Sequence, residues 1–543
     1  MKKLYLLLTA FAFAAKTFAQ CTETPEPKVL LVGDSWAFFM NTEATINNVF
    51  KTWGHSNYKF VSNATLAENG AQTDDFQKAD KEAEILNQLT LNPSIKVVHL
   101  SIGGNDFLGD WKKSYTQGHT DTLMDEVFVR LDSVMRFIKS CKPGIKIFYS
   151  GYVYPNFEET IHDLAPFESN HPFYGTWQGM EFPSFLEINN LLNDVSAKVE
   201  VKTANDPDLA FVKCTGLMQW TTGQNPALGV PPGGTYPAHS VTLPLGDPTY
   251  PSPKTTMRDY GLLKDCYHLS TQGYKDFVAY HTQKFYHKFL MDDLYLLSDA
   301  ANTGSVSSQG NVSSSLFLGE ASGEQFATVL SFNTTAMADT TLRKASIFIR
   351  RKALTGTTPV SGTLNIKVKN GNFGSSATVE AADFGATGDG SATPCLFGSY
   401  ANNDDWARLD IPTSLFPYIN HNGITQFVIS APNFTGGKEE FYDSSDPDFA
   451  PVLNTAYGTP TGIKEADLSK EFTVYPNPST NMLTIGTGAE SIKHIEVTNL
   501  LGQTVLLPHL MENNIDISAL QPGMYILNVA TKNGRASKRI VKE

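Results

Sequence analysis

The chain has 543 residues, of which 41% are hydrophobic and 18% charged, and its formal net charge is −13. This length suggests about three domains of ordinary globular composition. The acidic balance argues against a nucleic-acid-binding protein, because contact with phosphate backbones needs a basic surface.

The N-terminus has the pattern of a secretory signal peptide. Lys2 and Lys3 precede a short apolar stretch, and the small residue Ala19 lies near its end. We expect residues 1–20 to be removed on export and exclude them from the fold. Cys21 raises a lipoprotein alternative, although no small residue stands directly before it. No later segment is apolar enough to span a membrane.

The first strand predicted after this region runs straight into a turn. Four apolar residues, 29–32, lead into Gly33, Asp34, Ser35 and Trp36. A buried strand of this kind would place Ser35 at the carboxyl end of a sheet, where α/β proteins bind their ligands. Ser35 could act there as a nucleophile, or it could only help to cap a helix.

From residue 28 to about 298, strands and helices alternate along the chain. This alternation predicts a parallel sheet with helices on both faces. Apolar runs predict further strands at 95–104, 145–155 and 209–218. Apolar residues at helical spacing predict helices at 125–141 and 276–290.

The segment 156–260 is rich in proline, glycine and aromatic residues. We expect a long insertion here, which serves either as a lid or pocket wall or only as surface decoration.

Two glycine-rich turns offer donors for an oxyanion. Gly104 and Asn105 follow the strand at 95–102, and an asparagine side chain can donate an N–H to an oxyanion. Gly70 lacks a side chain, so its backbone N–H can approach a substrate closely. Asp106 is expected to cap the turn or to support its neighbours. Ordinary turn chemistry explains the same residues without a site.

A base and its orienting group are predicted near the end of this region. Asp265 and His268 stand three residues apart, in a segment expected to be a loop before the closing helix. A carboxylate can then hold one ring nitrogen while the other takes a proton from Ser35. The alternative is a pair that only caps the helix.

Five cysteines are spread along the chain without the spacing of a metal site. Export permits disulfides, and we expect a bond between Cys214 and Cys266, which both flank predicted elements of this region. The alternative, that the cysteines are buried and reduced, stays open.

Beyond this region the pattern changes from alternating elements to short strands. A Ser/Gly/Asn-rich linker is expected at 299–314 and an all-β sandwich at 315–458. A second linker at 459–470 leads to a small Ig-like sandwich at 471–543.

Residues 28–290 resemble the GDSL/SGNH hydrolase family. The resemblance implies a flavodoxin-like three-layer α/β/α fold and ester hydrolysis without a metal or other cofactor. In its terms Ser35 is the nucleophile, and Asp265 and His268 complete the triad. The backbone N–H of Ser35, with Gly70 and Asn105, forms the oxyanion hole. The motifs that carry it are Gly33-Asp34-Ser35, Gly70, Gly103-Gly104-Asn105-Asp106, and Asp265 with His268, while Trp36 stands where leucine is common.

Two further resemblances cover the rest of the chain. Residues 471–543 resemble the C-terminal sorting domain of the Bacteroidetes type IX secretion system, which implies that the secretion machinery is a partner and that the protein is secreted or on the cell surface. The string 441–453 is similar to the pattern that ends jelly-roll stalk domains. On this pattern residues 315–458 are similar to such domains and are expected to be a spacer, or to bind carbohydrate. The sorting-domain motifs are Tyr475-Pro476-Asn477-Pro478, Asn499-Leu500-Leu501-Gly502-Gln503 and Leu520-Gln521-Pro522-Gly523-Met524-Tyr525.

These observations lead us to expect a secreted serine esterase, with an acylated, most simply acetylated, glycan as substrate. A lipase, lysophospholipase or thioesterase would use the same mechanism. A non-catalytic surface binding protein or adhesin is the alternative from another class.

Overall fold

The computed structural model describes most of the chain as two compact units. The expected signal peptide and the expected linker at 459–470 lie outside the described residues, which are 21–223, 236–337, 341–457, 472–486, 492–499, 504–506, 513–531 and 535–543. The two units comprise Met1–Met337 with Ala345–Thr455, and Ala338–Lys344 with Ala456–Glu543.

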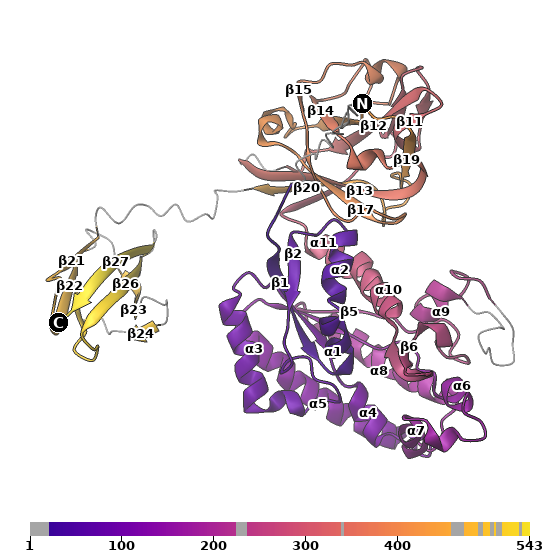
Figure 1. Ribbon diagram of the computed structural model, residues 1–543, viewed down its shortest axis with the longest axis vertical. Coiled ribbons are helices and arrows are strands. Elements are labelled where there is room, and N and C mark those ends of the chain that lie inside the picture. Colours follow the sequence, from indigo (N-terminus) through magenta and orange to yellow (C-terminus); the bar gives the residue numbers. More distant parts are fainter. Residues whose placement is uncertain are drawn as a thin grey trace, which may run out of the picture. The chain divides into compact units, whose positions relative to one another are not determined.

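A five-stranded sheet forms the centre of the first part of the chain (Figure 1). Its order is β2-β1-β3-β4-β5, and every pairing is parallel. From β1 the chain first forms the edge strand β2 on one side, and it then adds β3, β4 and β5 on the other side. This strand order is that of flavodoxin-like sheets. The strands are β1 Glu26–Gly33, β2 Tyr58–Val61, β3 Val97–Ser101, β4 Lys146–Ser150 and β5 Leu209–Val212.

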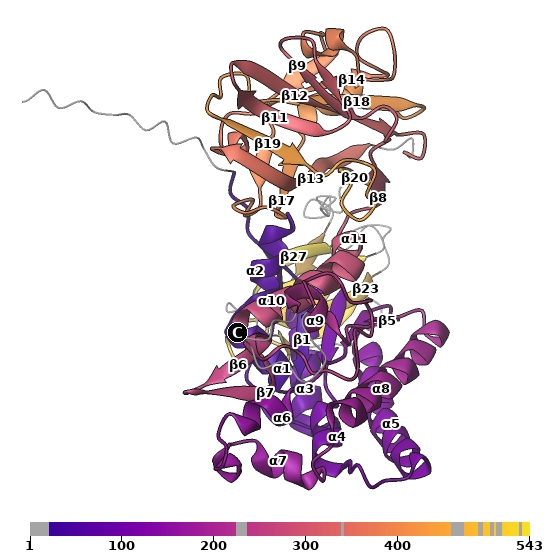
Figure 2. The ribbon, with the colours of Figure 1, turned by 90° about the vertical axis from the view of Figure 1, so that its right-hand side faces the viewer.

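Helices cover both faces of this sheet (Figures 1 and 2). Leu30 and Val32 of β1 point into one core, and Val29 and Leu31 point into the other, because side chains alternate along a strand. The first core contains side chains of α3 Ala79–Leu91, α5 Gln117–Cys141 and α8 Phe185–Asn205. The second contains side chains of α1 Ser35–Thr42, α2 Thr45–Thr52 and α10 Thr271–His281. The expected α/β class with helices on both faces is observed.

The segment 156–260 is not a single insertion. It contains α8 and the edge strand β5, so a large part of it belongs to the central α/β architecture. Its remaining helices are short, and residues 224–235 lie outside the described part. These helices are α6 Phe157–His162, α7 Tyr174–Gly179 and α9 Leu217–Thr222.

A hairpin and a long helical segment close the α/β part. The hairpin consists of β6 Met257–Tyr260 and β7 Leu263–Leu269, and it projects from this part of the molecule (Figure 2). Helix α10 continues through a π-helical turn, Thr282–Tyr286, into α11 His287–Phe289. The predicted closing helix at 276–290 therefore begins five residues earlier than expected.

A large antiparallel β structure follows. Its main path is β15-β14-β18-β12-β11-β19-β13-β17-β16. The expected linker 299–314 is wrong in part, because β9 and β10 lie within it and β9 pairs with β12. A jelly-roll connectivity stays a prediction. The strands are β8 Leu294–Leu297, β9 Gly304–Ser307, β10 Val312–Ser313, β11 Leu316–Ala321, β12 Glu324–Asn333, β13 Leu342–Gly356, β14 Asn365–Asn370, β15 Gly390–Ala392, β16 Cys395–Phe397, β17 Trp406–Asp410, β18 Ile424–Ser430, β19 Gly437–Phe441 and β20 Val452–Tyr457.

This β structure packs directly on the α/β part. The rings of Trp53 and Trp406 stack with centroids 5.8 Å apart. Arg408, 1% exposed, donates to the backbone oxygen of Gly54 at 3.2 Å and to Oδ1 of Asn57 at 2.6 Å. The two parts therefore share one core, which is why they form one compact unit.

The cysteine pairing differs from the expectation. Cys214 and Cys266 are both free and buried, and they belong to the cores on opposite faces of the sheet. The sheet lies between them, so they cannot bond. The disulfide instead joins Cys21 to Cys395 of β16.

The second unit is a small β-sandwich around its own apolar core. One sheet has the order β21-β22-β25 and the other β24-β23-β26-β27. The strands are β21 Thr473–Tyr475, β22 Met482–Gly486, β23 Ile492–Thr498, β24 Thr504–Leu506, β25 Asn514–Asp516, β26 Gly523–Thr531 and β27 Arg535–Lys542.

Across the described residues of both units, no helix is long and apolar enough to cross a bilayer.

Candidate active site

The turn from β1 into α1 fixes the position of Ser35. Gly33 has φ +156°, and a Cβ on it would lie 1.8 Å from the backbone oxygen of Ser101, so a larger residue cannot occupy this close approach of β1 and β3. Asp34 caps α1 by accepting from the backbone N–H of Trp36 at 3.0 Å. Ser35 is the first helical residue, and an amide at that position has no acceptor within the helix.

The structure brings Ser35, His268 and Asp265 together in one hydrogen-bonded chain. Ser35 Oγ lies 2.7 Å from His268 Nε2, and His268 Nδ1 lies 2.7 Å from Asp265 Oδ2. Ser35, His268 and Asp265 are buried residues, at 4%, 6% and 2% exposure. The other carboxylate oxygen of Asp265 accepts from the backbone N–H groups of Tyr267 and His268, both at 2.9 Å, which fixes the orientation of the carboxylate.

Asp265 and His268 lie on strand β7, not in the loop expected from the sequence. Met257 of β6 pairs with Leu269, and Asp259 pairs with Lys264, so four residues of β7 stand opposite a single residue of β6. Such a bulge bends the strand and redirects its side chains. It allows residues three apart on a strand to contact each other, which regular alternation would prevent.

The side chains of Asp34 and Tyr152 connect the turn that carries Ser35 with Gly104, which follows strand β3. The hydroxyl of Tyr152 donates to Asp34 Oδ2 at 2.5 Å and accepts from the backbone N–H of Gly104 at 3.0 Å. A Cβ on Gly104 would lie 2.9 Å from the Tyr152 ring. Burial raises the pKa of Asp34 to about 6, and the hydrogen bonds from Tyr152 and Trp36 oppose that rise.

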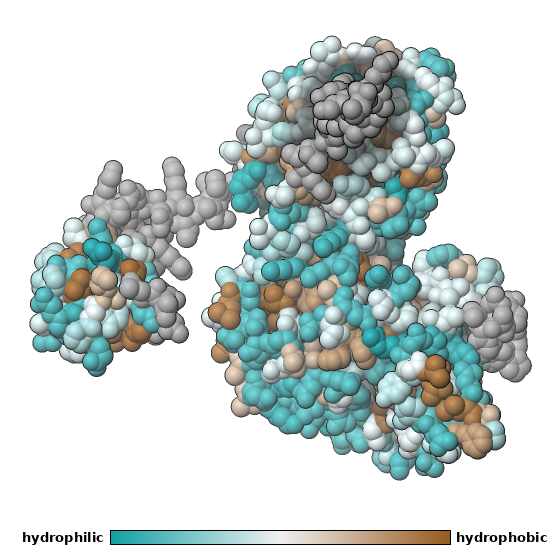
Figure 3. All heavy atoms as spheres, viewed as in Figure 1, coloured by the Kyte–Doolittle hydropathy of each residue, from teal (hydrophilic) through white to brown (hydrophobic). Residues whose placement is uncertain are grey.

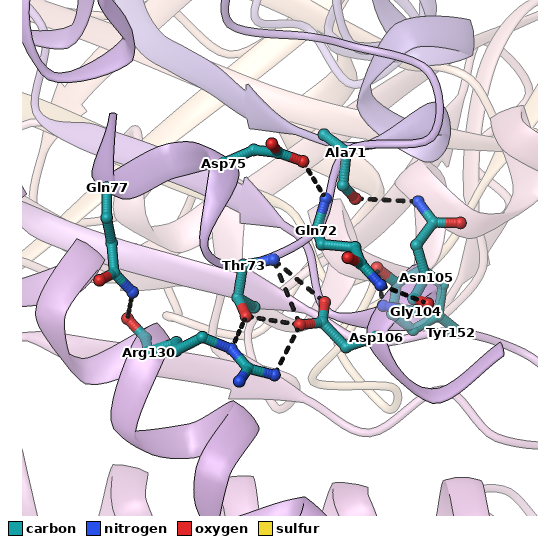
Figure 4. Close-up of polar contacts among 10 residues, drawn as sticks. All are labelled: Ala71, Gln72, Thr73, Asp75, Gln77, Gly104, Asn105, Asp106, Arg130 and Tyr152. Carbon is teal, nitrogen blue, oxygen red and sulfur yellow. Dashed lines mark hydrogen bonds and ion pairs between the residues drawn. The ribbon is translucent and has the colours of Figure 1, made fainter. Parts of the chain in front are cut away.

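Asn105 lies on α4 Gly104–Asp110 and faces the same cavity as Ser35. Its Nδ2 donates to the backbone oxygen of Ala71 at 2.9 Å (Figure 4). An amide nitrogen carries two hydrogens, so one N–H remains for another acceptor. Gly70 does not line this cavity. It is exposed, with φ +85°, at the turn before Ala71.

Asp106 is buried and holds the 71–75 loop against α4 and α5. Its carboxylate accepts from the hydroxyl of Thr73 at 2.6 Å, from the backbone N–H of Thr73 at 3.1 Å and from Arg130 at 3.1 Å (Figure 4). Arg130 also donates to the Thr73 hydroxyl at 2.9 Å. The expected supporting role of Asp106 therefore has a physical basis in these contacts.

A cavity of about 60 Å³ opens beside Ser35. Its lining includes the polar residues Ser35 and Asn105, together with Gly104. The rest of the lining is mainly apolar. Part of it comes from α4, α8 and the turn after α7, including Phe107, Leu108, Met180, Ile188, Leu191 and Leu192, and part from α1, β7 and the carboxyl end of β4.

The outer surface near this part of the molecule also carries apolar side chains. Phe167 is 65% exposed, and Leu262, at the tip of the β6–β7 hairpin, is fully exposed. Hydrophobic atoms gather at the lower right of the α/β part (Figure 3).

Sequence reasoning missed Tyr152, Thr73 and Arg130. The position of Tyr152 in the sequence could have indicated a role in the site. It follows the carboxyl end of β4, and the carboxyl ends of parallel strands meet at one edge of the sheet. Nothing in the sequence singles out Arg130, because it is one of several charged residues on a long amphipathic helix.

The C-terminal residues match a known family. Residues 473–543 match the secretion system C-terminal sorting domain. This confirms the sorting domain predicted from the motifs and indicates a secreted or cell-surface protein. No curated protein matches the chain.

Solved structures similar to the chain include esterases and a lipase. A GDSL-like lipase from Bacteroides thetaiotaomicron is 15% identical, with 49% of this chain and 89% of that chain covered and a TM-score of 0.27. A family 3 carbohydrate esterase from Clostridium thermocellum is 16% identical, with 49% and 98% covered and a TM-score of 0.26. A carbohydrate esterase of the same family from Talaromyces cellulolyticus is 11% identical, with 49% and 98% covered and a TM-score of 0.27.

Proposed function

We propose that the α/β part hydrolyses carboxylic esters, with Ser35 as nucleophile, His268 as general base and acid, and Asp265 as the group that orients His268. The observation that carries this proposal is the pair of 2.7 Å contacts that join Ser35 Oγ to His268 and His268 to Asp265. A hydroxyl, a base in reach and a fixed carboxylate are the parts that covalent ester hydrolysis needs.

The first half of the reaction forms an acyl-enzyme. Ser35 Oγ attacks the ester carbonyl carbon while His268 Nε2 takes the hydroxyl proton. The oxyanion that forms accepts from the backbone N–H of Ser35 and from the second N–H of Asn105. When the intermediate collapses, the C–O bond to the alcohol breaks and His268 gives its proton to the departing oxygen.

The second half releases the acid. A water attacks the acyl carbon and gives a proton to His268. The bond to Ser35 Oγ then breaks, and the serine recovers its proton from His268. The balance is one ester and one water to one acid and one alcohol, so the protein's own residues supply every proton transfer.

An acylated carbohydrate is the substrate class we propose for the alcohol side. Two features of the chain support this choice. The sorting domain indicates export, and the β structure that shares a core with the α/β part would suit a protein that works on a polymer.

The proposal is tested with the full-length protein and p-nitrophenyl acetate, by comparing the wild type with Ser35→Ala. We expect kcat/KM to fall by at least about 10³-fold, because the nucleophile is lost while the fold is kept. Ser140→Ala, an exposed serine at the end of α5, is the matched control and should keep the wild-type rate.

Equal rates for the wild type and Ser35→Ala would eliminate the esterase. That result would favour the alternative of a surface binding protein, for which retention on insoluble glycans is the direct measurement.

A further inference from the structure

We infer that the cavity beside Ser35 binds the acyl chain of the substrate, and that it takes a chain of about four to six carbons instead of acetate. This inference rests on the proposed ester hydrolysis and goes beyond it by naming the acyl group.

The cavity joins the candidate nucleophile to a mainly apolar lining, and an acyl group likewise joins a polar carbonyl to an alkyl chain. Ser35 and Asn105 both line the cavity, and the ester carbonyl must sit beside them for attack. Most of the other lining side chains are apolar, among them Phe107, Ile188 and Leu191. An acyl carbonyl held at Ser35 therefore directs its alkyl chain along these walls.

The hydroxyls of two tyrosines that line the cavity, Tyr149 and Tyr152, are already paired. The Tyr152 hydroxyl donates to Asp34 and accepts from Gly104, so Tyr152 presents its ring to the cavity instead of a free hydroxyl. A sugar ring placed there would bury hydroxyls without partners, which costs free energy. An alkyl chain carries no such groups, and its burial is favourable. The cavity therefore fits the acyl side of the ester, and the alcohol remains toward solvent.

The size of the cavity sets the chain length. A water-sized group needs roughly 15 Å³ of such space, so about 60 Å³ holds about four methylene-sized groups. Acetate offers one methyl group beyond its carbonyl and leaves most of the cavity unfilled. Butanoate and hexanoate fill it, whereas dodecanoate is longer than the cavity.

The experiment compares kcat/KM of the full-length protein for p-nitrophenyl acetate, butanoate, hexanoate and dodecanoate. Each buried methylene is expected to raise kcat/KM about three- to fourfold. We therefore expect butanoate to exceed acetate about tenfold, and dodecanoate to fall below hexanoate. Ser35→Ala, measured on the same series, separates enzymatic from spontaneous hydrolysis.

Leu192→Trp tests the position of the chain. Leu192 lines the cavity from α8 and is only half-buried, so a larger side chain there can fill the cavity from its edge. We expect the hexanoate-to-acetate ratio of kcat/KM to fall about tenfold. Leu186→Trp, on the exposed side of the same helix, is the matched control and should keep the wild-type ratio.

Three results would overturn the inference. Ser35-dependent hydrolysis that is fastest with acetate would remove the acyl cavity and leave the proposed function standing. An unchanged hexanoate-to-acetate ratio of kcat/KM in folded Leu192→Trp would also overturn the acyl cavity and leave the proposed function standing. Hydrolysis that does not depend on Ser35 for any ester would overturn both the acyl cavity and the proposed function. If Leu192→Trp does not fold, the wild-type series alone decides.

Discussion

At the scale of single residues, Tyr152 links the two turns that face the candidate nucleophile. Its hydroxyl is both donor and acceptor, to the Asp34 carboxylate and from the Gly104 N–H. Asp34 is 1% exposed, and its burial already raises its pKa to about 6. Loss of the hydroxyl would leave a buried carboxylate with one fewer donor beside Ser35.

We expect Tyr152→Phe to lower the free energy of unfolding by about 2 kcal/mol, because it leaves two buried polar groups without this partner. We also expect a lower kcat, since Asp34 caps the helix on which Ser35 lies. Urea unfolding and p-nitrophenyl butanoate turnover measure the two effects.

Tyr149→Phe is the matched control for this change. It removes another buried phenol hydroxyl, which donates to the Ile102 backbone oxygen at 2.8 Å and does not touch Asp34. Its kcat should exceed that of Tyr152→Phe. A kcat for Tyr152→Phe equal to that of the control would contradict a role for this link in positioning Ser35.

At the scale of elements, a loop and two helices are joined by one buried carboxylate. Asp106 on α4 binds Thr73 of the loop and Arg130 of α5, and the same loop accepts the hydrogen bond of Asn105 through Ala71 (Figure 4). The orientation of Asn105 therefore depends on α5, although no residue of α5 lines the cavity.

Arg130→Leu tests this dependence. It leaves Asp106 buried without its cation, and we expect the free energy of unfolding to fall by about 2 kcal/mol. We also expect kcat to fall, because the 71–75 loop loses its tie to α5. Thermal unfolding and turnover are measured on the same preparation.

Arg136→Leu serves as the comparison, because Arg136 is an exposed arginine on the same helix. It should leave both quantities close to the wild-type values. If Arg130→Leu also kept wild-type turnover, the loop would not depend on this ion pair for its position.

The sequence was sufficient for several of the central elements but not for others, such as β2 and α8, nor for local irregularities. Apolar runs predicted β1, β3 and β4 because a strand buried on both faces must be apolar throughout. The bulge in β7 was not predictable, since it depends on pairing with β6 and leaves no mark in the composition. Asp265 and His268 were therefore expected in a loop, although their contact with each other was predicted from their spacing.

At the scale of the whole molecule, packing between distant segments decided what the sequence left open. The expected bond between Cys214 and Cys266 failed because the sheet separates them, a fact that requires the three-dimensional arrangement of both cores. The shared core of the α/β part and the β structure was also not predicted. Trp53 and Trp406 are 353 positions apart in the sequence, and nothing in either segment indicates that they stack.

Histidines are buried on the α10 side of the sheet, among them His99, His281 and His287. Burial lowers the pKa of His99 and His287 to about 3 and that of His281 well below its usual range. His281 is fully buried, and neither of its ring nitrogens has a hydrogen-bond partner among the described residues. These rings therefore remain neutral in the folded protein under mildly acidic conditions.

The sign of the effect on stability follows from where the protons bind. Below a pH of about 6.5 the unfolded chain protonates its histidines while these buried rings stay neutral, so each lowers the free energy of unfolding by up to about 1.4 kcal/mol per pH unit. Asp34 and Glu159 act in the opposite direction. Burial raises their pKa values to about 6 and about 7, so the folded state takes up these protons first. A single-histidine variant is needed to separate the two contributions.

We therefore expect His281→Leu to reduce the acid sensitivity of the fold. Between pH 7.5 and pH 5.5, the wild type should lose about 1.4 kcal/mol more unfolding free energy than the variant, because the variant's unfolded state binds one proton fewer. Urea unfolding at the two pH values measures this difference. His119→Leu, at an exposed position on α5, should behave as the wild type. Equal losses in the wild type and His281→Leu would mean that the folded core accepts a charged imidazolium at this position, although His281 is fully buried and has no hydrogen-bond partner in the described part of the chain.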